Sequence, residues 1–276
     1  MRFLEHRIAD KRILRLIAKW LKVGVATKEG RIERSMRGAP QGAVVSPTLA
    51  NVYLHYALDL WAHRWRQNKA RGDVIIIRYA DDFIAGFQHE HEARAFLQDL
   101  HERLREFELA LHPAKTRLIR FGRFAAEQRK KRGEGKPETF DFLGFTHFCT
   151  RSKAGGFVIG RKTIKKRMVT KLKALKVELR KRMHDSIAAT GEWLNLLLKG
   201  HLNSFAVPGN SLSLWWFFHE IRWRWLRSLR RRSQKANLSW EKFHRLTDRF
   251  FPPIRILHPQ PLHRFDARTQ GRSPVR

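Results

Sequence analysis

Two neighbouring aspartates, Asp81 and Asp82, are the residues whose type and spacing most directly suggest chemistry. They separate two short apolar runs, at residues 74–77 and 83–87. Adjacent carboxylates repel each other, and burying them is costly unless a cation lies beside them. Hard divalent ions such as Mg²⁺ prefer such oxygen ligands and share them with substrate phosphates. The pair is a candidate two-metal site for phosphoryl transfer. The alternative is a solvated turn, in which aspartate is a favoured residue.

The flanking patterns predict the elements that hold this pair. The two apolar runs predict a β-hairpin with Asp81 and Asp82 at its tip. Apolar residues at helical spacing predict helices over residues 3–23, from Pro47 to Trp61, and over residues 90–107. Strands are expected at residues 117–121, at residues 139–145 and after a turn at Gly155-Gly156, with a loop over residues 122–138. This order predicts an α+β fold for residues 1–160.

The second half of the chain is predicted to be helical and basic. Helices are expected over residues 162–183, 190–206, 210–233 and 239–249. They form a predicted all-α domain over residues 161–251, followed by a weakly ordered basic tail at 252–276. The chain holds 57 Lys and Arg against 25 Asp and Glu, and residues 151–276 hold 29 of the former and 7 of the latter. Such an excess predicts a polyanionic partner that contacts mainly the second half.

Composition also limits the surroundings of the protein. No run of about 18 apolar residues occurs, and the first residues lack the apolar core of a signal peptide, so membrane insertion is not expected. The single cysteine, Cys149, excludes an internal disulfide and a Cys-rich zinc module. This usage is compatible with a reducing cytoplasm.

Candidate nucleic-acid contacts lie on the predicted helices. Residues 161–182 hold 11 Lys and Arg and one acid, Glu178, opposite an apolar stripe, which is typical of a face that tracks phosphates. Further on, Trp215, Trp216, Trp223 and Trp225 interleave with arginines, a mixture that suits RNA. At this helical spacing, however, core packing is the expected role of most single tryptophans. The candidate RNA-binding residues are Lys165, Lys166, Arg167, Lys173, Arg222, Arg224, Arg230 and Arg231.

Four blocks of the sequence resemble motifs of reverse transcriptases, in the family's order. They are Tyr79-Ala80-Asp81-Asp82, Arg37-Gly38-Ala39-Pro40-Gln41-Gly42, His112-Pro113-Ala114-Lys115-Thr116 and Phe142-Leu143-Gly144-Phe145. The resemblance implies a polymerase palm in which Asp81 and Asp82 are catalytic and bind Mg²⁺. It also implies that Gln41 and Gly42 meet template and nucleotide, that Lys115 meets phosphate, and that Leu143 and Gly144 grip the primer. The simpler alternatives are a sharp glycine turn, a solvated lysine and ordinary strand packing.

The helical half is similar to the thumb, or maturase, domain of bacterial group II intron proteins. The segments that carry this likeness are residues 197–201, 207–210, 229–234, Trp240 and 256–259. The resemblance implies an RNA-directed DNA polymerase and maturase of the bacterial cytoplasm. Its partners would be a group II intron RNA, an RNA template with a DNA primer, and deoxynucleoside triphosphates. The oligomeric state and the intron stay open.

The match to the family departs at the start of the chain. The family's third metal-binding Asp lies on a strand before the helix that residues 3–23 resemble. Asp10 and Asp59 lie within predicted helices and are not expected to replace it. The expectation is therefore an N-terminally truncated form with impaired catalysis. Two alternatives remain: a non-catalytic RNA-binding splicing factor, and a general basic nucleic-acid binder.

Overall fold

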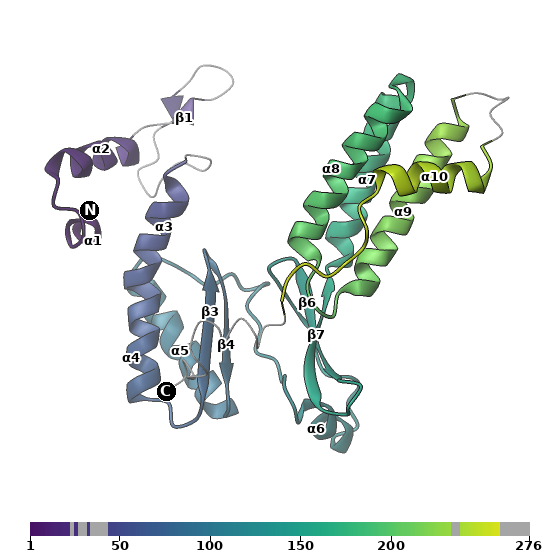
Figure 1. The fold of residues 1–276 in the computed structure, drawn as a ribbon. Coiled ribbons are helices and arrows are strands. Elements are labelled where there is room, and N and C mark those ends of the chain that lie inside the picture. The colour runs from purple at the N-terminus through teal and green to yellow at the C-terminus, as the bar shows by residue number, and fades with distance from the viewer. Residues whose placement is uncertain (23–24, 27–31, 34–43, 233–237, 260–276) are drawn as a thin grey trace. The chain divides into compact units, whose positions relative to one another are not determined.

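A computed structural model describes residues 1–22, 25–26, 32–33, 44–232 and 238–259, and it divides the chain into two compact units (Figure 1). The described residues up to Leu118 form the N-terminal unit, and those from Ile119 onward form the C-terminal unit. Helices and small antiparallel sheets occur together, as an α+β composition predicts. No helix among the described residues is long and apolar enough to cross a bilayer.

Two helices begin the N-terminal unit where the sequence predicted one over residues 3–23. They are α1 (Arg2–Glu5) and α2 (Lys11–Lys22). The prediction was wrong because Asp10 starts a new helix: its Oδ1 accepts the Arg12 backbone N–H at 2.7 Å, as an N-cap does. Short strands β1 (Val25–Ala26) and β2 (Ile32–Glu33) follow and pair antiparallel.

A long helical run and α5 form the core of the N-terminal unit. The helix predicted from Pro47 is confirmed and extends further, through α3 (Ser46–Leu54), a π-helical segment η1 (His55–Asp59) and α4 (Leu60–Asn68). The predicted helix α5 (Glu90–Glu106) is also confirmed. Buried side chains from the two helical runs pack together: Leu58, Ala62 and Trp65 from one, and Phe96, Leu100 and Leu104 from the other.

The predicted hairpin is confirmed as β3 (Val74–Tyr79) and β4 (Asp82–Phe87). Ile76, Phe83, Ala85 and Phe87 pack against the helical core. Ile75, Ile77 and Tyr79 are exposed, so β3 alternates between a face toward the helices and an open face.

The segment that joins the helical core to the next sheet differs from the prediction. Residues 116–121 form no strand in the described part of the chain, and residues 125–131 form a helix, α6 (Ala125–Lys131), inside the predicted loop. Ala, Glu, Gln, Arg and Lys all favour helices, and Ala125 is buried, which explains α6. Phe121 instead packs its ring on Phe140, with centroids 5.0 Å apart.

A three-stranded antiparallel sheet of β5 (Phe140–Phe142), β6 (Phe145–Arg151) and β7 (Phe157–Thr163) lies in the C-terminal unit. The single strand predicted over residues 139–145 was wrong because a turn interrupts it. Leu143 and Gly144 have φ values of 48° and 86°, and two successive positive values are typical of a two-residue hairpin turn. The predicted turn at Gly155-Gly156 is confirmed, with Gly155 at a φ of 81°.

The four predicted helices are confirmed as α7 (Lys165–Lys181), α8 (Ile187–Phe205), α9 (Ser211–Arg230) and α10 (Trp240–Phe250), with a 3₁₀ turn η2 (Arg182–His184) after α7. Helix α7 begins later than predicted because Thr163 still pairs in β7. Ser186 and Ser239 cap α8 and α10 by accepting backbone N–H groups. The buried core formed by these four helices includes Leu172, Leu198, Phe217 and Trp225.

The start of the tail is held against α8. The Leu257 and His258 backbone N–H groups donate to the Ala206 carbonyl at 3.0 and 3.1 Å, and His258 Nε2 lies 2.7 Å from the Asn203 carbonyl. Residues 252–259 of the predicted tail thus make defined contacts with α8, and residues 260–276 lie outside the described residues. The weak order predicted for the tail stays a prediction.

The compact units divide between Leu118 and Ile119, well before the boundary predicted near residue 160. The reason is that the β5–β7 sheet is bonded to the helices: Asn210 accepts the Thr163 N–H at 2.9 Å and donates to Thr163 Oγ1 at 2.9 Å. The assignment of residues 1–160 to a palm and 161–251 to a thumb stays a prediction.

Candidate functional site

Asp81 and Asp82 lie at the tip of the β3–β4 hairpin and are exposed. Tyr79 pairs with Asp82, which leaves Ala80 and Asp81 as the two turn residues. Directly paired residues point to the same face of a sheet, so Asp82 shares the open face with Tyr79. Arg78, which pairs with Phe83, points to the helix-facing side.

The turn holds a residue in an unfavourable conformation. Ala80 has a φ of 54°, in the left-handed region that glycine enters easily and other residues rarely adopt. Such a conformation costs about 1 to 3 kcal/mol and persists only where neighbouring groups enforce it. The groups that surround Ala80 therefore bear on how the carboxylates are presented.

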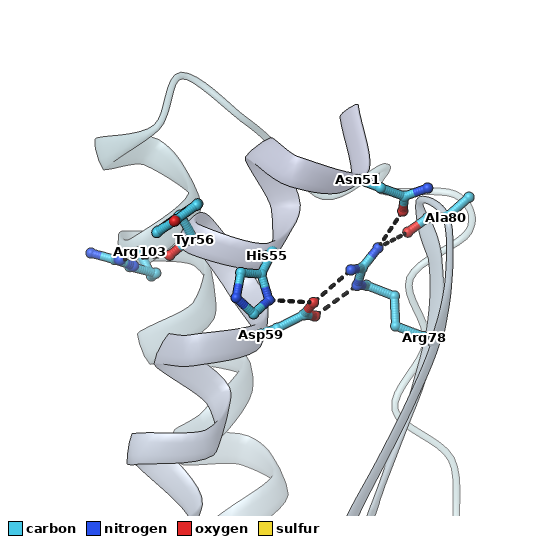
Figure 2. A network of polar contacts seen from close by, with 7 residues as sticks. All are labelled: Asn51, His55, Tyr56, Asp59, Arg78, Ala80 and Arg103. Atoms are coloured by element: carbon cyan, nitrogen blue, oxygen red, sulfur yellow. Dashed lines mark hydrogen bonds and ion pairs between the residues drawn. The ribbon is translucent and has the colours of Figure 1, made fainter. Parts of the chain in front are cut away.

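Arg78 joins the turn to the long helical run, as Figure 2 shows. Its Nε and Nη2 donate to the two carboxylate oxygens of Asp59 at 2.7 and 2.5 Å. Its Nη1 donates to the Asn51 Oδ1 at 2.8 Å and to the Ala80 carbonyl at 2.7 Å. One guanidinium thus contacts two helical side chains and the strained residue of the turn.

The Arg78–Asp59 pair is partly shielded from water. The Arg78 side chain is 15% exposed and that of Asp59 34%. The hydrogen bond to Asp59 raises the pKa of Arg78. Both Asp59 oxygens are engaged by Arg78, and His55 Nδ1 lies 3.5 Å from one of them. This pairing fits the expectation that Asp59 does not replace a metal-binding carboxylate.

The π-helical segment η1 sets the position of Asp59. The Leu60 N–H donates to the His55 carbonyl five residues earlier, so the segment is wider than an α-helix. Arg103 of α5 donates to the carbonyls of Tyr56 and Ala57 at 3.3 and 3.1 Å. Segments of this kind are frequent at functional sites.

Sequence reasoning missed Arg78, although a signal for it existed. Alternation along β3 puts Arg78 on the same side as Val74 and Ile76, which face the helices. A charged residue on a half-buried face needs an acidic partner, and Asp59 lies on the neighbouring helical run.

The two aspartates fit a divalent metal by their chemistry. Carboxylate oxygens at an exposed tip leave room for water and phosphate to complete an octahedral shell around Mg²⁺. Neither carboxylate forms an ion pair within the part of the chain that the structure describes. Among those residues, no group of three or more His, Cys, Asp or Glu could hold a metal ion.

The remaining predicted polymerase residues are placed separately. Gln41 and Gly42 lie outside the described residues. Lys115 is exposed in a turn after α5, where its backbone N–H donates to the His112 carbonyl at 3.1 Å. Among the described residues, no hydrogen bond or ion pair joins Lys115 to Asp81 or Asp82. Its proposed phosphate contact stays a prediction.

Leu143 and Gly144 form the β5–β6 turn in the C-terminal unit. The Gly144 carbonyl accepts the Ile164 N–H at 3.1 Å. A Cβ on Gly144 would lie 3.2 Å from the Phe205 ring and 3.9 Å from Arg167 Nη1. The close approach of Phe205 and the positive φ of Gly144 explain why glycine occupies this position. Leu143 is 49% exposed and is thus accessible for the primer contact that stays a prediction.

Helix α7 separates a buried face from a basic one. Met168, Leu172, Leu175 and Leu179 are buried in the helical core. Its exposed basic residues include the predicted Lys165, Lys166, Arg167 and Lys173. No ion pair of these four is found among the described residues. The face therefore carries unbalanced positive charge, as a phosphate-tracking surface requires.

The predicted arginines of α9 have different surroundings. Arg222 lies 3.5 Å from the Asp248 carboxylate, and Arg224 is paired with Glu220. Arg230 Nη2 donates to the Leu238 carbonyl at 3.3 Å, and Arg231 is exposed. Arg222 and Arg224 are thus partly neutralised within the chain, whereas Arg231 is available to a partner.

Aromatic rings form a continuous series on the surface of α9 and α10, which we call the aromatic ladder. The Trp215 ring stacks on that of His219 with centroids 5.1 Å apart, and the His219 and Trp223 centroids are 6.1 Å apart. The Trp223 and Trp240 centroids are 5.0 Å apart, and those of Trp240 and His244 are 5.8 Å apart. Trp215 is 57% exposed, whereas Trp225 of the same helix is fully buried. The tryptophans of α9 therefore divide between core and surface.

Comparison with known proteins identifies the family. The family described as "Reverse transcriptase (RNA-dependent DNA polymerase)" matches residues 1–147. An uncharacterized 91 kDa protein in cob intron of Schizosaccharomyces pombe is 48% identical over 52 residues, which are 19% of this chain and 6% of that protein. Protein YkfC of Escherichia coli is 31% identical over 30% of this chain and 28% of its own length.

The chain thus spans 6% and 28% of the lengths of these two relatives. The family match itself covers more than half of the chain and includes the hairpin, the π-helical segment and both turn aspartates. RNA-directed DNA synthesis is the activity that the family's description gives. This chain belongs to the reverse transcriptase family.

Proposed function

We propose that this chain is the palm and thumb portion of a group II intron reverse transcriptase and maturase. The observation that carries the proposal is the exposed Asp81–Asp82 turn, which lies within the reverse transcriptase match and is anchored through Arg78. Asp81 would ligate Mg²⁺, with Asp82 as the supporting carboxylate. When bound, the metal pair supplies activation of the 3′-hydroxyl and stabilisation of the pyrophosphate.

The remaining polymerase roles follow the motif resemblance. Gln41 and Gly42 would contact template and nucleotide, and Lys115 the phosphates. Leu143 and Gly144 would grip the primer, and the exposure of Leu143 supports that role. The substrates would be an RNA template with a DNA primer and deoxynucleoside triphosphates.

The maturase part of the proposal rests on the C-terminal unit. The basic face of α7 could track an RNA backbone, and the aromatic ladder could stack unpaired bases. The name of one relative places that protein in a cob intron, which supports an intron RNA as the partner.

A second candidate is a non-catalytic RNA-binding splicing factor. It is favoured by the contrast between the large basic face of α7 and a turn where the described residues bring only two carboxylates together. The two candidates differ in whether Asp81 matters for any activity.

Two variants separate the roles in one experiment. RNA-templated primer extension uses a form of the protein that includes the strand with the family's third metal-binding Asp, and RNA affinity is measured on the same protein. Asp81→Asn should lower DNA synthesis at least about a hundredfold, because a metal ligand is lost, and should leave RNA affinity unchanged. Replacing Lys165, Lys166 and Arg167 by Gln should lower RNA affinity and reduce the salt slope by about 2.

The matched control replaces Lys130, Lys131 and Arg132 of the α6 region, which are equally exposed and carry the same charge. Unchanged synthesis in Asp81→Asn would overturn the catalytic assignment. Equal losses of RNA affinity in the α7 and α6 variants would overturn the assignment of the α7 face to RNA binding. Intron RNA binding and splicing without DNA synthesis by the intact protein would favour the second candidate.

A further inference from the structure

Arg78 links the strained turn to the helical run that carries Asp59 and Asn51. Ala80 has a φ of 54°, and its carbonyl accepts from Arg78 Nη1 at 2.7 Å. That guanidinium is fixed by two bonds to Asp59, at 2.7 and 2.5 Å, and one to Asn51. The donor that contacts the turn therefore has little freedom of its own, because a bidentate pair defines the plane of the guanidinium.

The long helical run supplies both side chains that hold the Arg78 guanidinium. Asp59 is the last residue of the π-helical segment η1, and Asn51 lies two turns earlier in α3. Arg103 of α5, which lies beside Tyr56 in Figure 2, supports the segment by donating to the carbonyls of Tyr56 and Ala57. Arg103 thus supports the helical segment that carries Asp59, and Asp59 in turn holds the Arg78 guanidinium that contacts the hairpin tip.

We propose that Arg78 and Asp59 are positioning residues that hold Ala80 in its left-handed conformation and thereby fix how Asp81 and Asp82 meet a divalent metal. This inference rests on the proposed polymerase function of the turn. Neither residue would contact the metal, because Arg78 lies on the opposite side of the hairpin from Asp82 and both Asp59 oxygens are bonded to Arg78. Their effect would pass through the backbone of the turn.

The strained alanine makes the role testable. Glycine adopts positive φ without a Cβ clash, so a turn with glycine at this position should not need the Arg78 contact. Lysine at position 78 would keep the charge but could not bond to Asp59 and to the Ala80 carbonyl with one planar group. If Arg78 acts on the turn, Ala80→Gly should therefore rescue Arg78→Lys. A role confined to packing of the hairpin on the helices predicts no such rescue.

The readout uses the three tyrosines of the chain, Tyr53, Tyr56 and Tyr79, labelled as 3-fluorotyrosine. Tyr79 is 66% exposed beside the turn, whereas Tyr53 donates to the Phe107 carbonyl and Tyr56 stacks on Phe3. Fluorine NMR of the full chain then reports the turn without metal, and Mn²⁺, which takes the oxygen ligands of Mg²⁺, broadens resonances near a bound ion.

We expect Arg78→Lys and Asp59→Asn each to shift or split the Tyr79 resonance and to raise the Mn²⁺ concentration needed for broadening about tenfold. Adding Ala80→Gly to Arg78→Lys should restore one resonance and most of the Mn²⁺ response. The matched control is Arg94→Lys, which changes an exposed arginine paired with Glu90 on α5 and should behave as wild type.

Wild-type spectra in Arg78→Lys and Asp59→Asn would overturn the proposal, as would failure of Ala80→Gly to rescue. Failure of the proposed function has a different signature. If Mn²⁺ does not broaden Tyr79 in the wild type, or broadens it equally in Asp81→Asn, the metal site is wrong. The metal-free spectra then still decide whether Arg78 and Asp59 position the turn.

Discussion

A histidine ring lies buried in the core of the C-terminal unit. His201 is 2% exposed, and neither ring nitrogen has a partner among the described residues. Its ring stacks between those of Phe205 and Phe217, at centroid distances of 4.7 and 3.8 Å. Burial lowers the pKa of His201 to about 3, and the charge of Lys171 adds to this effect. The histidine is therefore held neutral at physiological pH.

His201 should make the C-terminal unit sensitive to acid. Because its pKa in the folded state lies below the ordinary 6.5, the unfolded chain binds the extra proton first, and stability falls as pH drops from 6.5 toward 3. The loss should reach about 2 kcal/mol at pH 5. Urea unfolding at pH 7.5 and 5, followed by tryptophan fluorescence, should show a smaller pH difference in His201→Phe. The exposed His244→Phe is the control, and parallel behaviour of His201→Phe and wild type would contradict the assignment.

At the level of single elements, helix α9 shows how one amphipathic segment serves both core and surface. Trp225 is fully buried and packs on Phe243 at 5.7 Å, whereas Trp215 is 57% exposed at one end of the aromatic ladder. Helical geometry turns residues ten positions apart to different sides. The same residue type on the same helix thus has two separable roles.

Truncating these two tryptophans should affect different properties of the protein. Trp225→Ala should destabilise the C-terminal unit by about 3 to 5 kcal/mol, because it leaves a cavity. Trp215→Ala should change stability by less than about 0.5 kcal/mol. It should nevertheless weaken binding of single-stranded RNA about tenfold, because a stacking surface is lost. Thermal unfolding and fluorescence anisotropy measure the two effects. Leu212→Ala, at a residue 85% exposed on α9, is the matched control; unchanged RNA affinity in Trp215→Ala would remove the ladder from the interface.

Strong local patterns made most elements predictable from the sequence. The two apolar runs around Asp81 and Asp82 predicted the β3–β4 hairpin, and helical spacing predicted α5 and α7 to α10. What the pattern missed depends on individual contacts: the Asp10 cap divides the first helix, and the Leu143-Gly144 turn divides a strand. The Arg78–Asp59 pair was missed because alternation along β3 places Arg78 on the helix-facing side but does not identify its partner on another element.

For the whole molecule, charge and organisation point to the same half of the chain. Residues 151–276 hold 29 Lys and Arg against 7 Asp and Glu, and the described part of this half includes the α7 face and the aromatic ladder. Some of that charge is neutralised internally, as Arg222 and Arg224 show. Charge alone attracts any nucleic acid, so total affinity does not distinguish a maturase from a general basic binder.

Salt should separate these two possibilities for the full chain. Phosphate contacts weaken steeply as salt rises, whereas stacking and shape-specific contacts weaken much less. We therefore expect that raising salt from about 0.1 to about 0.5 M lowers affinity for an unrelated RNA far more than for a group II intron RNA of equal length. Filter binding at several salt concentrations measures both slopes. Equal affinities that fall in parallel would identify a general basic binder. A difference that persists at high salt and is lost in Trp215→Ala would place RNA recognition on the aromatic ladder, because removing one ring changes no charge.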